Sequence, residues 1–181
     1  MEPGLDFVPV AVKLRRGVRV TVRAIRPDDA DRLQSAIRAM SDESRYSRFM
    51  GTLRELPPAL LDQAIQPRAG REMQLVAVTG EGAEETIVAG ARYSSESGST
   101  ECEFAVALID AWQGRGLARR LLELLMQHAR ASGFTRMEGY ILASNTRMLG
   151  LARRLGFVTV ESAEGPTVRK VRCDLTPSSA L

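Results

Sequence analysis

Apolar residues recur at two different spacings along the chain, and these spacings predict where strands and helices lie. Alternation of apolar and polar residues predicts strands, whereas apolar residues three and four positions apart predict helices. The predicted strands cover residues 10–14, 18–25, 73–79, 86–93, 101–109, 137–143, 157–160 and 168–175. The predicted helices begin near residues 27, 41, 57, 117 and 145.

The order of these elements predicts the fold class. Two strands are followed by helices, three strands, a helix, a strand, a helix and two strands. Because strands and helices alternate near the middle of the chain, we predict an α/β (α+β) fold, with a mixed sheet and helices on both faces. A chain of 181 residues has room for one core, so we expect a single domain over residues 10–175 between an N-terminal arm (1–9), expected to be loose, and a C-terminal tail (176–181).

Composition narrows the possible partners. The chain carries 25 Lys and Arg against 22 Asp and Glu, and it has no dense basic run that would indicate nucleic-acid binding. Cys102 and Cys173 lack metal-ligand spacing, so we expect free thiols and no metal. No apolar run is long enough to span a membrane, and the N-terminal residues lack the basic region and long apolar core that are typical of a signal peptide. We therefore expect a cytoplasmic protein without membrane or nucleic-acid partners.

The segment 112–120 joins a predicted strand to a predicted helix and contains two glycines. Gly114 and Gly116 permit backbone conformations that other residues avoid, and they allow a ligand to approach the main chain. The N-terminus of the following helix favours an anion such as a phosphate. Further positive charge comes from Arg115, Arg119 and Arg120. A simple tight turn is the alternative, since the segment has neither the third glycine of a Rossmann loop nor the Gly-Lys-Ser/Thr of a P-loop.

Residues Gln113–Ala118 resemble the Gln/Arg-x-x-Gly-x-Gly/Ala acetyl-CoA loop of the GNAT N-acetyltransferase superfamily. Within it, the chain resembles the GNAT domain of Pat-type bacterial protein lysine acetyltransferases over residues 10–175. The matching motifs are Ile25-Arg26-Pro27-x-Asp29-Ala30, Ser44-Arg45-Tyr46-x-Arg48-Phe49, Arg71-Glu72-Met73, Glu103-Phe104-Ala105-Val106 and Trp112-Gln113-Gly114-Arg115-Gly116. The resemblance implies the GNAT acyl-CoA N-acyltransferase fold, with a mostly antiparallel twisted sheet, and acetyl-CoA as cosubstrate.

The resemblance also implies which residues contact the coenzyme. A β-bulge would splay the strand 101–109 from the strand 137–143, and the pantetheine arm would lie in the gap. Asn145 matches a cofactor-contacting Asn of the family, although Asn is also a common helix N-cap. The implied cofactor-binding residues are Val106, Ala107, Leu108, Gln113, Gly114, Arg115, Gly116, Leu117, Ala118, Arg119, Asn145, Met148 and Ala152.

Acetyl transfer to an amine requires a base. A lysine ammonium has a pKa near 10.4, so its neutral form at pH 7 costs roughly 4–5 kcal/mol. A neighbouring carboxylate can take the proton directly or through water. Strand alternation places Glu101 and Glu103 on one face, beside the small side chains of Ala105 and Ala107. Pat-type enzymes have a catalytic glutamate at the position of Glu103; a structural glutamate paired with an Arg is the alternative.

Other positions are open to two readings. Many GNAT enzymes carry a general-acid Tyr where this chain has Ala152, so we expect the leaving thiolate to be protonated by water or only on release. Tyr46 and Phe49 could line the acceptor site or belong to the core, and Arg45 and Arg48 could recognise acidic groups or be solvated. His128 lies late in a predicted helix, where we expect it to interact favourably with the helix dipole.

The leading hypothesis is an acetyl-CoA-dependent N-acetyltransferase that acetylates a primary amine by direct attack in a ternary complex, with a protein lysine as acceptor. A small-molecule amine acetyltransferase is the first alternative. The second is a non-catalytic module that senses acetyl-CoA, although a sensor has no need of a base at Glu103. The sequence leaves the acceptor and the oligomeric state open.

Overall fold

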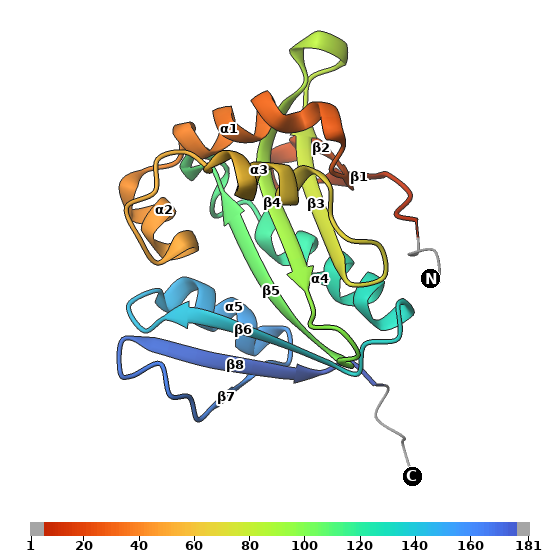
Figure 1. Ribbon diagram of the computed structural model, residues 1–181. Helices are drawn as coiled ribbons and strands as arrows, with labels where there is room; N and C mark the ends of the chain where they lie inside the picture. Colours follow the sequence, from red (N-terminus) through yellow and green to blue (C-terminus); the bar gives the residue numbers. More distant parts are fainter. Residues whose placement is uncertain (1–5, 177–181) are drawn as a thin grey trace.

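The computed structural model describes residues 6–176 and places eight strands in one sheet, in the order β1-β2-β3-β4-β5-β6-β8-β7 (Figure 1). The strands are β1 (Val10–Lys13), β2 (Arg19–Ala24), β3 (Glu72–Thr79), β4 (Thr86–Ser94), β5 (Glu101–Leu108), β6 (Arg136–Leu142), β7 (Val158–Val160) and β8 (Val168–Asp174). Only the pair β5–β6 is parallel within this part of the chain. The predicted mixed, mostly antiparallel sheet is confirmed.

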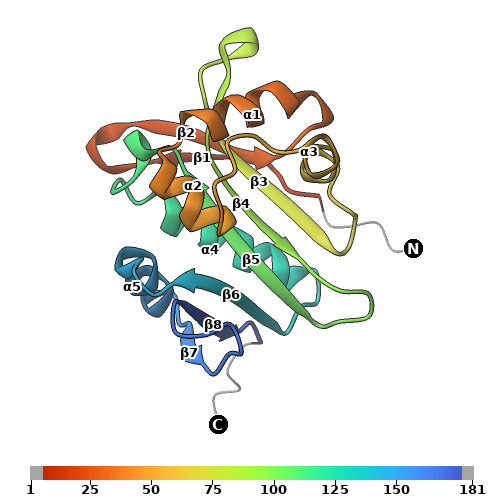
Figure 2. The same cartoon turned by 60° about the vertical axis from the view of Figure 1, so that its left-hand side comes forward.

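Helices cover both faces of the sheet, as predicted (Figures 1 and 2). The helices are α1 (Ala30–Ala39), α2 (Asp42–Phe49), α3 (Pro58–Ile65), α4 (Leu117–Ala131) and α5 (Thr146–Arg154). Helices α4 and α5 pack on one face, where Leu121, Leu125 and Met137 are completely buried in the larger core. Helices α1 and α3 pack on the other face over a smaller apolar cluster that includes Ile65 and Val76.

A buried ion pair ties the start of α1 to the sheet. The guanidinium of Arg23 on β2 donates to both carboxylate oxygens of Asp29, at 2.7 and 2.9 Å, and also to Glu85 at 2.5 Å. The amide of Arg26 donates to Asp29 at 2.8 Å. Burial opposes the charge of Asp29, but these hydrogen bonds outweigh it and lower the pKa of the carboxyl. The Arg-Pro-x-Asp motif therefore has a structural role, because its Asp29 connects the start of α1 to β2.

Strands β5 and β6 are paired over only the first half of their length. They are paired from Glu101–Arg136 to Phe104–Gly139, whereas β5 stays paired with β4 as far as Leu108. Figure 1 shows the two strands diverging toward α2 and α5. The predicted splay is thus present, but the expected β-bulge in β5 was wrong. The register of β5 against β4 and β6 is regular, and the shift in the sheet lies between β3 and β4, at Ala77/Val78.

Two side chains make contacts that the sequence did not predict. His128 lies near the end of α4 and is buried. Its Nδ1 lies 3.0 Å from the Tyr93 hydroxyl, so it also takes part in a hydrogen bond inside the core. The arm is not loose at Phe7, whose ring centroid lies 6.3 Å from that of His128. Residues 1–5 and 177–181, the rest of the arm and nearly all of the tail, lie outside the described residues. Within residues 6–176, every helix is too short or too polar to cross a bilayer.

Candidate active site

A cavity of about 820 Å³ opens where β5 and β6 diverge. Helix α2 forms one wall, β5 and β6 form the floor, and the loop between β7 and β8 forms the opposite wall. The lining residues are Tyr46, Arg48, Met50, Glu103, Phe104, Ala105, Tyr140, Leu142, Ala143, Ser144, Glu164, Pro166, Thr167 and Val168. Tyr46 lines this cavity, and its side chain is 48% exposed.

Glu103 lies in this cavity without a partner for its carboxylate. No hydrogen bond or ion pair involves its side chain in residues 6–176. The two other glutamates on this part of the sheet are both paired. Glu101 accepts from Arg136 at 2.5 Å, and Glu138 contacts Lys170 and Arg172, both at 2.6 Å. Of these three carboxylates, only that of Glu103 is available to an incoming amine.

The surroundings of Glu103 raise its pKa above the ordinary value of a glutamate. Partial loss of water around the carboxyl group is the main cause, because it disfavours the charged form. The nearby positive charges of Arg92 and Arg48 act in the opposite direction. Since a general base works best when its pKa approaches the working pH, this shift suits proton abstraction.

The glycine loop has the backbone conformation that the sequence predicted. Gly114 and Gly116 have φ angles of +74° and +87°, in the region that side chains disfavour. A Cβ at Gly116 would meet nothing within 4 Å, so open space lies in front of the loop. Within residues 6–176, the amides of residues 114–119 donate to no main-chain carbonyl. Unpaired amides at the N-terminus of a helix such as α4 are groups that favour an anion.

A protein-family model described as an acetyltransferase (GNAT) domain matches residues 19–158. That range contains the diverging strands, the glycine loop and Glu103. The chain belongs to the GNAT family of acetyltransferases. It is therefore an N-acetyltransferase, and the resemblance inferred from its motifs is confirmed.

Relatives of this GNAT protein include Pat. Acetyltransferase PA5475 of Pseudomonas aeruginosa is 36% identical over 142 residues, which are 78% of this chain and 76% of that protein. Acetyltransferase Pat of Mycolicibacterium smegmatis is 30% identical over 166 residues; they cover 91% of this chain but only 49% of Pat, so the chain spans about half the length of that relative. The solved GNAT domain of S. lividans Pat superposes with a TM-score of 0.84 at 29% identity, over 92% of this chain and 96% of that one.

The cofactor-binding residues expected in this GNAT protein occupy different environments. Val106 and Ala107 are half-buried on the stretch of β5 that β6 leaves unpaired, and Leu108 ends that stretch. The side chain of Asn145 accepts from the amide of Met148 at 3.1 Å, which confirms that Asn145 is the N-cap of α5. The residues are thus spread over the splayed strand, the loop and the start of α5.

Some of these side chains are covered. Leu117 and Ala152 are each only 1% exposed, so the side chain of Ala152 is not on a surface that a ligand could touch. At Leu117 the main-chain amide, rather than the side chain, is available at the helix N-terminus. Ala118 is half-buried and packs on the core, whereas Arg119 pairs with Glu123 at 2.8 Å. Arg115 lies over the ring of Trp112, 5.1 Å from its centroid.

The structure also reveals contacts that sequence reasoning did not anticipate. Asp110 accepts from the amide and hydroxyl of Ser41 at 2.7 and 2.8 Å, and from the hydroxyl of Ser44 at 2.7 Å. The Gln113 side chain donates to the same Ser44 hydroxyl at 3.0 Å. Helix α2, which forms a wall of the cavity, is therefore fastened to the segment that leads into the glycine loop. These residues lie 66–69 positions apart, and no local pattern indicated the contact.

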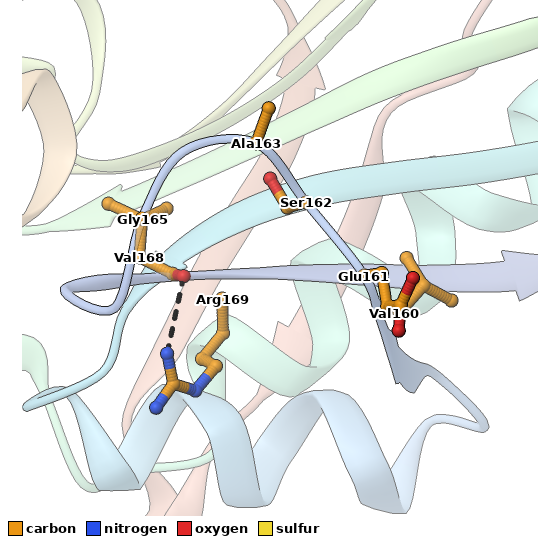
Figure 3. A pocket seen from close by; sticks show the side chains of 7 residues that line it. All are labelled: Val160, Glu161, Ser162, Ala163, Gly165, Val168 and Arg169. Atoms are coloured by element: carbon orange, nitrogen blue, oxygen red, sulfur yellow. Dashed lines mark hydrogen bonds between the residues drawn. The ribbon is translucent and has the colours of Figure 1, made fainter.

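A second hollow, of about 560 Å³, lies beside the loop between β7 and β8 (Figure 3). Its two charged residues are both exposed, and Arg169 donates to main-chain carbonyls of its own hairpin rather than to Glu161. This hollow lacks a convergent set of reactive groups. Among residues 6–176, no group of three His, Cys, Asp or Glu side chains could hold a metal ion, and Cys102 and Cys173 are free thiols.

Proposed function

We propose that this protein transfers the acetyl group of acetyl-CoA to a primary amine, and that the acceptor is a protein lysine. The single observation that carries the proposal is the unpaired carboxylate of Glu103, held in an open cavity where β5 and β6 diverge. The glutamate motif shared with Pat-type enzymes supports the choice of lysine, as do the exposed side chains of Tyr46 and Met50 on the cavity wall.

The residues present fit the coenzyme. The amides at 114–119, with open space before Gly116, suit its diphosphate, and the unpaired edge of β5 at 105–108 suits the amides of its pantetheine arm. Bound there, acetyl-CoA would supply an acetyl thioester. A main-chain N–H of that edge would donate to the thioester oxygen and stabilise the charge developing on it.

Glu103 would act as the general base. An amine entering the cavity arrives as an ammonium, and the carboxylate attracts it before taking its proton, directly or through one water. The neutral amine then attacks the thioester carbonyl while both substrates are bound. The C–N bond forms, the C–S bond breaks, the product amide loses the second amine proton, and coenzyme A leaves as a thiolate that is protonated by water or on release. The positive charge of Arg92, on the neighbouring strand, favours the ionised form of the carboxylate.

The proposal can be tested with labelled acetyl-CoA. The protein would be incubated with a bacterial lysate in one arm and an amine library in the other, and label would be followed on protein and on small molecules. Label on protein lysines supports the proposal, and label confined to small amines favours the first alternative. Absence of acceptor-dependent thiol release in both arms would instead favour a sensing module.

Gly116→Ala should weaken acetyl-CoA binding about tenfold or more. A methyl group there strains the left-handed backbone by roughly 1–2 kcal/mol and enters the space assigned to the diphosphate. Titration calorimetry measures the dissociation constant. Gly133→Ala is the matched control, because Gly133 has a φ of +88° and equally open surroundings just after α4. Equal affinities of the two variants would contradict this assignment.

Tyr140→Phe should retain most of the transfer activity. Tyr140 lines the cavity, and Ala152 stands where many GNAT enzymes have their general-acid tyrosine. Since we expect the thiolate to be protonated by water or only on release, the hydroxyl of Tyr140 is dispensable for that step. The measurement is kcat with a saturating amine, and a loss of about 10²-fold or more would identify Tyr140 as a general acid.

A further inference from the structure

Arg48 is a cation without a protein partner on the wall of the cavity. It is half-buried on α2, and its guanidinium carbon lies 4.8 Å from the ring centroid of Phe49. Within residues 6–176, its side chain makes no hydrogen bond and no ion pair with another residue. A planar guanidinium in this position has its donors free for a ligand.

Arg45, one turn earlier on α2, has hydrogen-bond partners within the described part of the protein, unlike Arg48. Its guanidinium donates to the carbonyls of Ile37 and Met40, and to the carboxylate of Asp42. Arg45 therefore fastens α2 to the end of α1, which corrects the two readings offered by the sequence. Because α2 is held at its start by Arg45 and by Asp110, Arg48 is carried on an anchored helix.

Arg48 and Glu103 place two separated charges of opposite sign in one cavity. Loss of water lowers the pKa of Arg48 to about 10, with a smaller contribution from Arg92, so the guanidinium remains positive at neutral pH. Arg48 and Glu103 attract each other through space but form no hydrogen bond. An acceptor that carries both an ammonium and a carboxylate would complement both charges.

We propose that Arg48 binds a carboxylate of the acceptor, so that amines with an acidic group close by are preferred. The proposal rests on the function proposed above, with Glu103 receiving the amine. Arg and carboxylate form two parallel hydrogen bonds, which fix orientation as well as adding affinity. The carboxylate could come from an Asp or Glu next to the lysine in a protein, or from the α-carboxylate of a free amino acid.

Matched peptides test the proposal and separate the two sources. Each peptide has blocked ends and one Lys, with Asp at one position from −2 to +2, and its partner has Asn at that position. Free lysine and lysine amide form the second arm. If the carboxylate comes from a protein, we expect the wild type to have an about tenfold higher kcat/KM for the best Asp peptide than for the Asn peptide of the same position. If it comes from a free amino acid, the same preference should hold for free lysine over lysine amide. Arg48→Gln should abolish this preference, and Arg48→Lys should restore part of it.

Arg54→Gln is the control variant, because Arg54 is exposed, lies outside the cavity wall and contributes the same charge. It should keep the full preference. Fluorescence anisotropy of labelled Asp and Asn peptides on Glu103→Gln, without acetyl-CoA, should show the same preference in binding alone. An equal loss on both peptides in Arg48→Gln, or no preference in the wild type, would overturn the role of Arg48. Absence of transfer to every amine, with the binding preference intact, would instead refute the proposed function.

Discussion

Glu103→Gln is expected to lower kcat by about 10²–10⁴-fold, with the affinity for acetyl-CoA nearly unchanged. The amide cannot accept the proton of the incoming ammonium, whereas the glycine loop is left intact. Thiol release with a saturating amine measures the rate. Because an amine with a pKa near 10.4 deprotonates on its own at high pH, the rate of the variant should rise steadily as pH approaches that value.

Glu101→Gln provides the matched control. Glu101 lies two positions away on β5, but its carboxylate is paired with Arg136, so this variant should keep its activity. The wild type should lose activity as pH falls through the pKa of Glu103, which lies above the ordinary glutamate value, because protonation removes the base. A raised pKa also means that folding disfavours the charged carboxylate. Glu103→Gln should therefore be at least as stable as the wild type at neutral pH.

Asp29→Asn is expected to lower the free energy of unfolding by about 3 kcal/mol, because it removes the fully buried carboxylate that Arg23 binds through two hydrogen bonds and leaves Glu85 as the one acidic partner of that buried charge among residues 6–176. Arg23 is 3% exposed and Asp29 is 0% exposed, so water cannot replace the lost interaction. Urea denaturation at pH 7 measures the change. Glu55→Gln is the control: its pair with Arg38 has the same 2.7 Å distance but is 53% exposed on both sides, and it should cost less than about 1 kcal/mol.

The pH dependence of stability gives a second measure of Asp29. Its pKa is lowered in the folded protein, so its contribution is present above the unfolded value and is lost as pH falls through the folded value. The free energy of unfolding of Asp29→Asn should therefore fall less than that of the wild type as the pH is lowered. If Asp29→Asn and Glu55→Gln unfolded at the same urea concentration, the joint between β2 and α1 would not have the importance assigned to it.

The order and type of the elements could be predicted because their causes are local. Alternation in β5 and the helical spacing of Leu117, Leu121 and Leu125 in α4 follow from which side chains must leave water. The loop conformation was predictable for the same kind of reason, since Gly114 and Gly116 adopt positive φ angles at little cost. The roles of Arg45 and His128 were not predictable, because their partners come from other elements or from main-chain groups that the fold brings near.

By itself, the sequence determined the strands and helices, the glycine loop and the presence of two candidate glutamates on one strand face. Only the tertiary structure decided which carboxylate is unpaired. Glu101 meets Arg136 on β6, whereas Glu103 faces the cavity that opens where β5 and β6 separate. The physical reason is that a charge acts on whatever lies within a few ångströms of it. Those neighbours are set by the pairing of distant strands and not by the order of residues along the chain.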